Sequence, residues 1–268
     1  MKREERYKLT KEREARYKII KEKKEDMMCE TIIDTKPPEN KPRVKFKKKY
    51  HAPFSETYDI LKELLKGKTK ILEVGPGRML KFPLATHSCG SETCDFSADP
   101  LPYKDKEFDF IYCRHVMEDL YNPFLLMQEM SRIGKAGYIE TPSPLVEMTR
   151  GIDGKDGVPP SQWRGYHHHR YFVWNHEGVL NFLTKYPIVE YAQTNDAEME
   201  RVLNKHPFTW QTYYLWTDKI KYKHFQHHLD ASMVKGKYTV LIEKAVQQSN
   251  TNSYHFFKDR EKLFKMSV

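Results

Sequence analysis

The feature that most constrains the fold is a short apolar run that ends in a glycine-rich turn. Residues 70–74 read Lys-Ile-Leu-Glu-Val and are followed directly by Gly75-Pro76-Gly77. A strand that passes at once into such a turn is typical of α/β folds that place a phosphate or a nucleotide at the turn. Because many folds share this feature, the run by itself predicts an α/β domain and no particular activity.

Two further apolar runs extend this pattern toward a parallel sheet. Residues 108–113 and 136–140 are predicted strands, and a helix between them begins with Asn122 as N-cap and Pro123 at its first position. A helix is also predicted from residue 55, at helical apolar spacing, to a C-cap at Gly67. Strand, helix and strand in succession favour parallel strands joined by crossovers.

The basic charge of the chain is confined to one end. The net charge is +9, and residues 1–50 contain 18 Lys and Arg against 10 Asp and Glu, so that residues 51–268 are nearly neutral. We interpret residues 1–50 as a basic helical or disordered arm with a proline-containing linker. A solvated helix or disordered arm is one interpretation; the other is an arm that makes weak, non-specific contact with nucleic acid or an anionic surface.

Composition excludes several classes of protein. The fraction of hydrophobic residues, 39%, is too high for a wholly disordered chain. We find no apolar run near the length of a membrane span, and the first 30 residues are rich in Lys, Arg and Glu, unlike a signal peptide. Four cysteines are too few for a disulfide scaffold and fit a reducing compartment, so we expect a cytoplasmic protein.

The residues around the glycine turn narrow the choice of ligand. Leu80 stands where a dinucleotide fingerprint needs Gly or Ala, and no Gly-Lys-Ser/Thr follows as in a Walker loop. Glu73 lies two residues before Gly75, where a carboxylate suits the ammonium group of an amino-acid-like cofactor. The glycines would let the backbone approach that cofactor closely.

Three segments together resemble a known family. The segments ILEVGPG (71–77), DFSADPLPYKDKEFDFIYCRHVMEDL (95–120) and NPFLLMQEMSRIGKAGYIETPSP (122–144) are similar to class I S-adenosylmethionine-dependent methyltransferases of the small-molecule, type 11-like kind. The resemblance implies an α/β fold with a Rossmann-like, mostly parallel sheet, flanking helices and an α+β C-terminal extension. It also implies S-adenosyl-L-methionine as cofactor, bound within residues 51–145. From their own pattern of apolar runs we interpret residues 146–268 as completing the sheet and covering the substrate.

The resemblance also implies roles for individual residues. The cofactor-binding positions would be Glu73, Gly75, Pro76, Gly77, Asp95, Phe96 and Arg114. The family's turn would pack against the methionine part, and an acidic residue before Leu101-Pro102-Tyr103 would contact the adenine. Only 17 residues separate Gly77 from Asp95, so we expect an abbreviated first crossover. The acid that holds the ribose has no clear counterpart: Glu92 is one choice, and Asp99 competes with Asp95 for the adenine.

The second half of the chain is predicted mainly as strands. We expect a strand at 171–174, a helix at 177–186, a strand at 188–191, a hairpin around Asp218 and a last strand at 238–242. His167, His168 and His169 stand in sequence here. Side chains of a strand alternate, so no three-ligand metal site is expected from them. Two interpretations of these histidines remain: their imidazoles face the substrate, or they take part in ordinary packing and hydrogen bonding.

The function predicted from the sequence is methyl transfer to a small molecule, such as a sugar or another hydroxyl-bearing metabolite. Positioning dominates this chemistry, and for a hydroxyl acceptor a general base helps. The candidate catalytic residues are His115, Glu118 and His168. Two alternatives remain open: a methyltransferase that acts on RNA or protein through the basic arm, and a non-catalytic protein that keeps the fold.

Overall fold

The structure is a computed structural model that describes residues 54–76, 82–153, 163–192, 194–225 and 237–259. The predicted basic arm and its linker, residues 1–50, lie outside the described residues, and so do Gly77 and Leu80.

A five-stranded sheet forms the centre of the described fold. Its order is β2 (His87–Cys89), β1 (Ile71–Val74), β3 (Phe110–Arg114), β4 (Ala136–Pro142) and β7 (Gln211–Thr217). The first four strands are parallel, and β7 pairs antiparallel with β4. The predicted Rossmann-like, mostly parallel α/β sheet is therefore confirmed.

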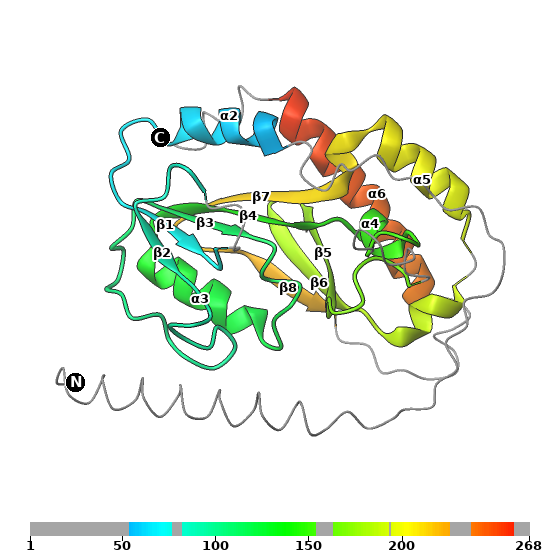
Figure 1. Ribbon diagram of the computed structural model, residues 1–268, viewed down its shortest axis with the longest axis horizontal. Helices are drawn as coiled ribbons and strands as arrows, with labels where there is room; N and C mark the ends of the chain where they lie inside the picture. Colours follow the sequence, from blue (N-terminus) through cyan, green and yellow to red (C-terminus); the bar gives the residue numbers. More distant parts are fainter. Residues whose placement is uncertain (1–53, 77–81, 154–162, 193, 226–236, 260–268) are drawn as a thin grey trace, which may run out of the picture. The chain divides into compact units, whose positions relative to one another are not determined.

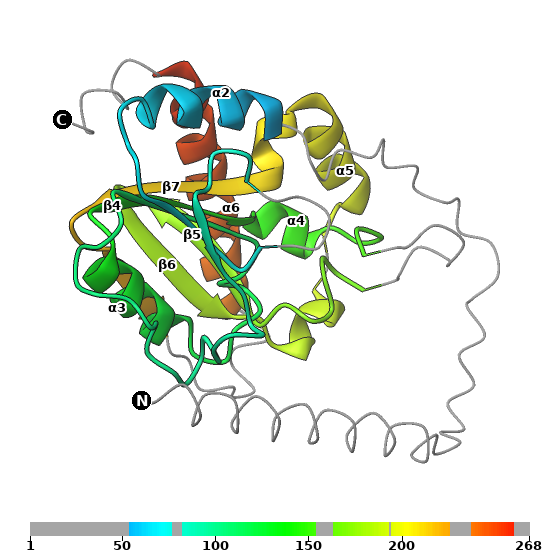
Figure 2. The ribbon, with the colours of Figure 1, turned by 60° about the vertical axis from the view of Figure 1, so that its left-hand side comes forward.

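Two helices cover opposite faces of this sheet (Figures 1 and 2). Helix α2 (Phe54–Leu64) packs with Ile71, and helix α3 (Pro123–Ile133) packs with Leu72 and Val74. Successive side chains of a strand point to opposite faces, so β1 contributes to both layers of the core. All four β1 residues are buried, as expected of a strand covered on both faces.

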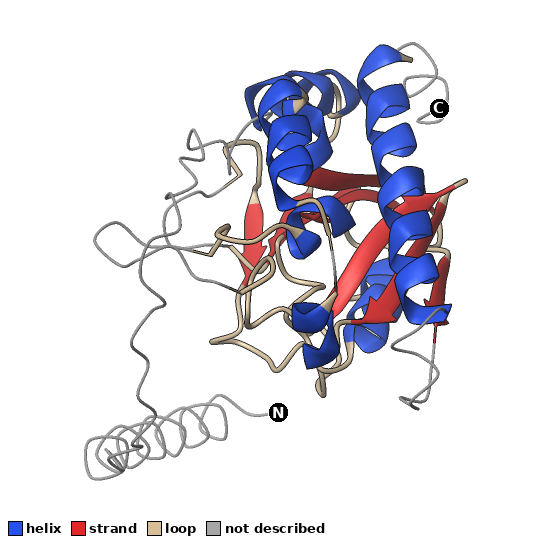
Figure 3. Ribbon diagram, turned by 90° about the vertical axis from the view of Figure 1, so that its right-hand side faces the viewer, coloured by secondary structure: helices blue, strands red, loops and turns tan. Residues whose placement is uncertain are grey.

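A smaller sheet and a long helix form the rest of the core. Strands β5 (Tyr171–His176), β6 (Val179–Thr184) and β8 (Tyr222–Phe225) make a three-stranded sheet, and α6 (Lys237–Lys258) packs on it. Figure 3 shows a long helix alongside the strands. The opposite face of the small sheet contributes to the same core cluster as α3. The remaining elements are α4 (Pro144–Met148), η1 (Pro187–Tyr191), α5 (Asp196–Lys205) and η2 (Pro207–Trp210).

Two expectations for the second half are wrong because of how its strands are buried and paired. Residues 179–184 form strand β6, not a helix: Leu180 and Phe182 enter one core cluster and Leu183 another. A strand buried on both faces lacks the alternation of apolar and polar residues that distinguishes a half-buried strand from a helix in the sequence. The expected hairpin around Asp218 is also absent from the described pairing, because β7 joins the large sheet and β8 the small one.

Two further expectations, both of strands, are wrong because tertiary contacts override the local preference of the residues for β structure. The expected strand at 188–191 belongs to the 3-10 helix η1, which begins at Pro187. The β-branched residues near 238–242 lie in α6, where Tyr238, Ile242 and Ala245 recur at helical spacing against the small sheet.

The connection from β1 to β2 is short, as expected. Twelve residues, 75–86, separate the end of β1 at Val74 from the start of β2 at His87, and residues 75–76 and 82–86 of this connection are not helical. Within the described residues, no helix has the length and apolar character needed to cross a membrane.

Candidate functional site at the carboxyl edge of the large sheet

The turn after β1 is built around Gly75. Gly75 has φ +70°, a conformation that side-chain-bearing residues seldom adopt, and its N–H donates to the carbonyl of Cys89 at the end of β2 (2.9 Å). A Cβ at Gly75 would lie 2.3 Å from Cγ2 of Val116, just after β3. Gly75 therefore brings together the ends of three neighbouring strands. This contact gives a physical reason for the glycine that is independent of any cofactor.

Glu73 has a structural partner in addition to its predicted role. Its carboxylate is buried and accepts the N–H of Phe82 at 3.0 and 3.1 Å. The carboxylate thereby fixes the backbone of Phe82 beside β1. Pro76 is half-buried next to it.

The acidic residues predicted to face adenine or ribose lie in turns after β2. Glu92 is exposed and folds back toward Gly90, where an added Cβ would lie 2.2 Å from Glu92 Oε2. Asp95 is exposed, and its Oδ1 accepts the N–H of Ser97 at 2.8 Å. Asp99 Oδ2 accepts the N–H of Asp95 at 3.0 Å. Phe96 is buried in the core.

His115 occupies a strained position at the end of β3. Its φ is +53°, unusual for a residue with a bulky side chain, and its N–H donates to the carbonyl of Glu140 at 2.8 Å. Its Nδ1 lies 3.3 Å from Glu118 Oε1 and its Nε2 lies 3.7 Å from Glu140 Oε1. The imidazole thus lies between two buried carboxylates. Such strain is concentrated at functional sites.

Glu140 on β4 joins Arg114 and His115, and the sequence analysis missed it. Arg114 and Glu140 are cross-strand neighbours, and Arg114 Nε donates to Glu140 Oε1 at 2.7 Å. Burial acts to raise the pKa of Glu140, but the polar contact with the His115 imidazole and the charges of Arg114 and His115 outweigh it and lower the pKa to about 2. Glu140 is therefore held ionised. The polar residue within an otherwise apolar strand, Ile139-Glu140-Thr141, was the available signal.

Glu118 and Asp119 follow His115 in the loop before α3. Glu118 is 1% exposed, and neither carboxylate oxygen has a hydrogen-bond partner within the described part of the chain. Burial and the neighbouring Glu118 charge raise the pKa of Asp119 to about 6, although His169 and His115 oppose this shift. The two carboxylates make this edge of the sheet electronegative.

The histidine segment lies at the same edge. The N–H of Arg170 donates to the carbonyl of Glu118 at 2.7 Å, and its guanidinium stacks over the Tyr121 ring at 3.5 Å. The Nε2 atoms of His168 and His169 each lie 3.7 Å from Asp119 Oδ1. The expected alternation of these side chains is wrong, because residues 167–168 form a turn, not a strand.

Glu147 of α4 holds the imidazole of His169 through Nδ1, the ring nitrogen that does not face Asp119. Glu147 and His169 are both buried, and His169 Nδ1 lies 2.7 Å from Glu147 Oε1. Lys185 Nζ contacts Glu147 Oε2 at 2.5 Å. Burial acts to raise the pKa of Glu147, but Lys185 and His169 lower it; burial likewise acts to lower the pKa of His169, and Glu147 raises it. No motif in the sequence indicated Glu147 or Lys185.

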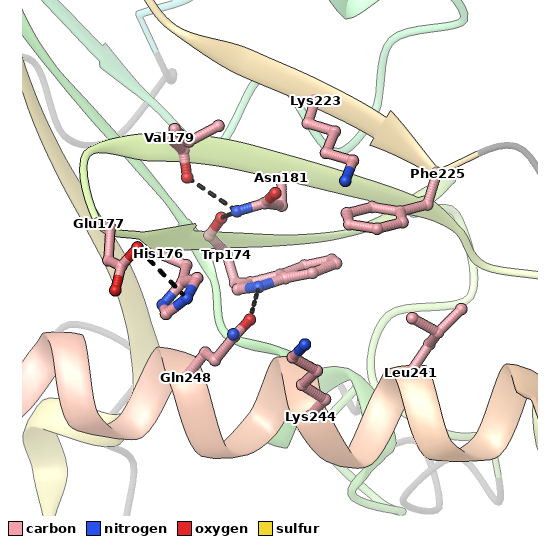
Figure 4. A pocket seen from close by; sticks show the side chains of 10 residues that line it. All are labelled: Trp174, His176, Glu177, Val179, Asn181, Lys223, Phe225, Leu241, Lys244 and Gln248. Atoms are coloured by element: carbon pink, nitrogen blue, oxygen red, sulfur yellow. Dashed lines mark hydrogen bonds and ion pairs between the residues drawn. The ribbon is translucent and has the colours of Figure 1, made fainter.

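A cavity of about 330 Å³ lies elsewhere, between the small sheet and α6 (Figure 4). Trp174 and Phe225 stack within it, with ring centroids 5.5 Å apart, and Gln248 accepts the indole N–H at 2.8 Å. Lys223 and Lys244 also line it. No residue that the sequence predicted as catalytic or cofactor-binding lines this cavity.

The structure therefore brings together most of the predicted site. The glycine turn, Arg114, His115, Glu118 and His168 all come from the carboxyl edge of the large sheet or from loops hydrogen-bonded to it. This is the edge where open α/β sheets bind ligands. Gly77 lies outside the described residues.

Comparison with known proteins gives one family match. Residues 72–139, from β1 into β4, match a family model described as a methyltransferase domain. No curated protein sequence matches the chain.

Three solved structures show limited similarity. A chain of the complex between the Haloferax volcanii Trm112 methyltransferase activator and a putative methyltransferase is 13% identical, with 66% of this chain and 99% of that chain covered and a TM-score of 0.31. An S-adenosylmethionine-dependent methyltransferase from Mesorhizobium loti is 11% identical, with 59% and 74% covered and a TM-score of 0.28. EvdMO1 is 15% identical, with 46% and 36% covered and a TM-score of 0.24. At these scores no function is transferred from them.

Proposed function

We propose that this chain, whose residues 72–139 match a methyltransferase-domain model, is a class I S-adenosylmethionine-dependent methyltransferase and that it methylates a small molecule that carries a hydroxyl group. The observation that carries the proposal is the position of His115. It follows β3, next to the Gly75 turn, with an imidazole nitrogen 3.3 Å from Glu118 and the other 3.7 Å from Glu140. A basic side chain is thereby available beside the expected methyl donor.

The residues after β1 and β2 fit the proposed cofactor by their chemistry. Glu92, Asp95 and Asp99 are carboxylates in turns at the carboxyl edge of the sheet, and carboxylates suit the hydroxyl groups of a ribose and the amino group of adenine. Gly75 and Pro76 form the turn at the end of the neighbouring strand β1. When bound, S-adenosylmethionine supplies a methyl group activated by a positively charged sulfur.

His115 has the chemistry needed on the acceptor side. A hydroxyl group becomes a better nucleophile as its proton leaves, and an imidazole can take that proton. The protonated imidazole would be stabilised by Glu118 and Glu140, both buried carboxylates. Glu118 lies too deep to reach the acceptor without His115, since it is 1% exposed. His168 is half exposed and lies at the outer rim, where it can contact the acceptor.

Cofactor binding is tested first, by titration of S-adenosylhomocysteine into the full-length protein. We expect saturable binding that weakens in Glu92→Gln or Asp95→Asn and stays unchanged in Glu177→Gln, an exposed carboxylate in the β5–β6 turn. The Gln and Asn replacements keep the side-chain size, so a loss reports the charge. Absence of binding to the unaltered protein would overturn the proposal.

The acceptor class is tested with methyl-labelled cofactor. The protein is incubated with separate small-molecule, RNA and protein fractions, and label is expected in the small-molecule fraction. Label in RNA or protein would overturn the choice of acceptor. Once the acceptor is known, His115→Gln should lower kcat by about 10²- to 10⁴-fold with little change in cofactor affinity.

A further inference from the structure

Three potential metal ligands converge beside the proposed acceptor site. Asp119 Oδ1 lies 3.7 Å from Nε2 of His168 and 3.7 Å from Nε2 of His169, and the ligating atoms of the three residues all lie within 4.8 Å of one another. A tetrahedral Zn²⁺ site with bonds of about 2.1 Å places its ligand atoms about 3.4 Å apart. The two distances from Asp119 exceed that spacing by only about 0.3 Å, and the two imidazole nitrogens, within 4.8 Å of each other, would have to close by at most about 1.4 Å to share one ion.

Glu147 orients His169 as a metal ligand. His169 Nδ1 lies 2.7 Å from Glu147 Oε1, and ionised Glu147 can only accept a hydrogen bond, so Nδ1 carries the proton. In neutral His169 the lone pair is then on Nε2, the atom that faces Asp119. A carboxylate that holds the far nitrogen of a histidine is a common arrangement behind metal-bound histidines. Lys185, which contacts the other oxygen of Glu147, fixes that carboxylate in turn.

The surrounding charges favour a cation. Glu118, beside Asp119, adds a buried carboxylate whose oxygens have no hydrogen-bond partner within the described part of the chain. Arg170 is a neighbouring cation, but its Nε donates to the backbone carbonyl of Asp119 at 3.1 Å and its guanidinium stacks on Tyr121. Neither contact neutralises the Asp119 carboxylate.

A second group of potential ligands shares His168 but is less suited. It consists of Asp153, His167 and His168, and His167 Nδ1 already pairs with Asp153. His167 and His168 are exposed there, whereas His169 in the first group is buried and oriented by Glu147. The first group is therefore the better site.

We propose that Asp119, His168 and His169 bind one divalent transition-metal ion, with Zn²⁺ as the best-fitting ion. Imidazole and carboxylate ligands suit Zn²⁺, and three protein ligands leave a fourth position open. The next step rests on the proposed function. Glu118, which directly precedes Asp119 in the chain, contacts the proposed base His115, so the metal ligands and the base border the same site. The open position of the ion would therefore take an oxygen of the acceptor. The ion would then orient the acceptor, while His115 takes the proton.

The test is a titration of Zn²⁺ into chelator-treated, full-length protein, with Co²⁺ absorption as a second reporter of coordination. We expect one ion per chain, and at least tenfold weaker binding in Asp119→Asn, His168→Ala and His169→Ala. His176→Ala, a half-exposed histidine paired with Glu177, is the matched control and should bind as the unaltered protein does. Glu147→Gln should weaken binding about 10- to 100-fold.

Several results would overturn the proposal. One is the absence of stoichiometric binding to the unaltered protein; another is unchanged affinity in both His168→Ala and His169→Ala. Loss of binding in His167→Ala but not in His169→Ala would move the site to the second group and would equally contradict it. Because His169 is buried, the exposed His168 variant keeps the test valid if His169→Ala does not fold. Titration of S-adenosylhomocysteine into the same samples separates failure of the metal site from failure of the proposed function.

Discussion

At the scale of single residues, even the small substitution of Gly75 by alanine should lower the free energy of unfolding markedly. Gly75→Ala would adopt φ +70° and place its Cβ 2.3 Å from Val116 Cγ2. The left-handed conformation costs about 1–2 kcal/mol and overpacking about 1–3 kcal/mol. We therefore expect the free energy of unfolding to fall by about 2–5 kcal/mol, as measured by urea denaturation.

Gly178 provides the matched control for this substitution. It has φ +73°, and nothing lies within 4 Å of an added Cβ. Gly178→Ala should therefore cost only the backbone contribution of about 1–2 kcal/mol. Adding Val116→Ala to Gly75→Ala should recover part of the larger loss. Equal losses in the two single variants would show that the Val116 contact has no effect.

Glu140 should make stability depend on acid pH. Burial acts to raise its pKa, but His115 and Arg114 lower it to about 2, below the value of about 4.3 in an unfolded chain. The ionised form therefore stabilises the fold above pH 4.3, and this contribution is lost as the pH falls through about 2. Its full size is on the order of 3 kcal/mol.

The measurement is urea unfolding of the unaltered protein and Glu140→Gln between pH 7 and pH 2. The variant should be less stable at pH 7, and its free energy of unfolding should fall less steeply below pH 5. Glu177→Gln, at an exposed position, should keep the steep dependence. Parallel curves for the unaltered protein and Glu140→Gln would contradict a lowered pKa at Glu140.

At the scale of elements, the start of α4 is fixed by a buried cap. Ser143 Oγ accepts the N–H of Val146 at 3.2 Å and donates to the carbonyl of Thr209 at 2.6 Å, and Ser143 is fully buried. Ser143→Ala removes the cap and leaves a buried carbonyl without this partner. We expect a loss of about 2–3 kcal/mol in the free energy of unfolding.

Asn195 at the start of α5 is the control for this prediction. Its side chain accepts the N–H of Glu198 at 3.1 Å in an exposed setting. Asn195→Ala should therefore lose only a cap contribution of about 1 kcal/mol. Thermal or urea unfolding of the two variants, compared at one pH, measures the difference. A larger loss at Asn195 than at Ser143 would contradict the importance of the Thr209 contact.

At the scale of the whole molecule, the uneven charge predicts where anionic polymers bind. Residues 1–50 carry a net charge of +8, from 18 basic and 10 acidic residues, and the remainder is nearly neutral. Any binding to RNA or DNA should be non-specific, weakened by salt and lost when residues 1–50 are deleted. Binding of both proteins across a salt series measures this. Equal affinity of the two proteins, or an affinity independent of salt, would contradict it.

The sequence was most informative where local signals and the global fold agree. The strand before Gly75 and the helix after Asn122 were predictable, because an apolar run with a clear stop or cap has one favourable local structure. The position of His115 at the carboxyl edge was predictable, because it directly follows a parallel strand and parallel sheets bind ligands at the carboxyl ends of their strands. A Glu177-Gly178 turn between β5 and β6, both residues at positive φ, was a hairpin signal that the prediction of a helix overlooked.

Only the tertiary structure decided the rest. Sequence spacing could not pair Arg114 with Glu140 or His169 with Glu147, because these partners come from different elements and their contacts depend on sheet register and helix packing. The convergence of His168 and His169 on Asp119 depends on a turn that strand-like alternation does not describe. The sequence by itself determined the parallel strands and the crossover helix between Ile71 and Pro142, where apolar runs and caps agree. The assembled fold determined which charges meet, since a buried charge is stabilised by whatever partner the packing brings within reach.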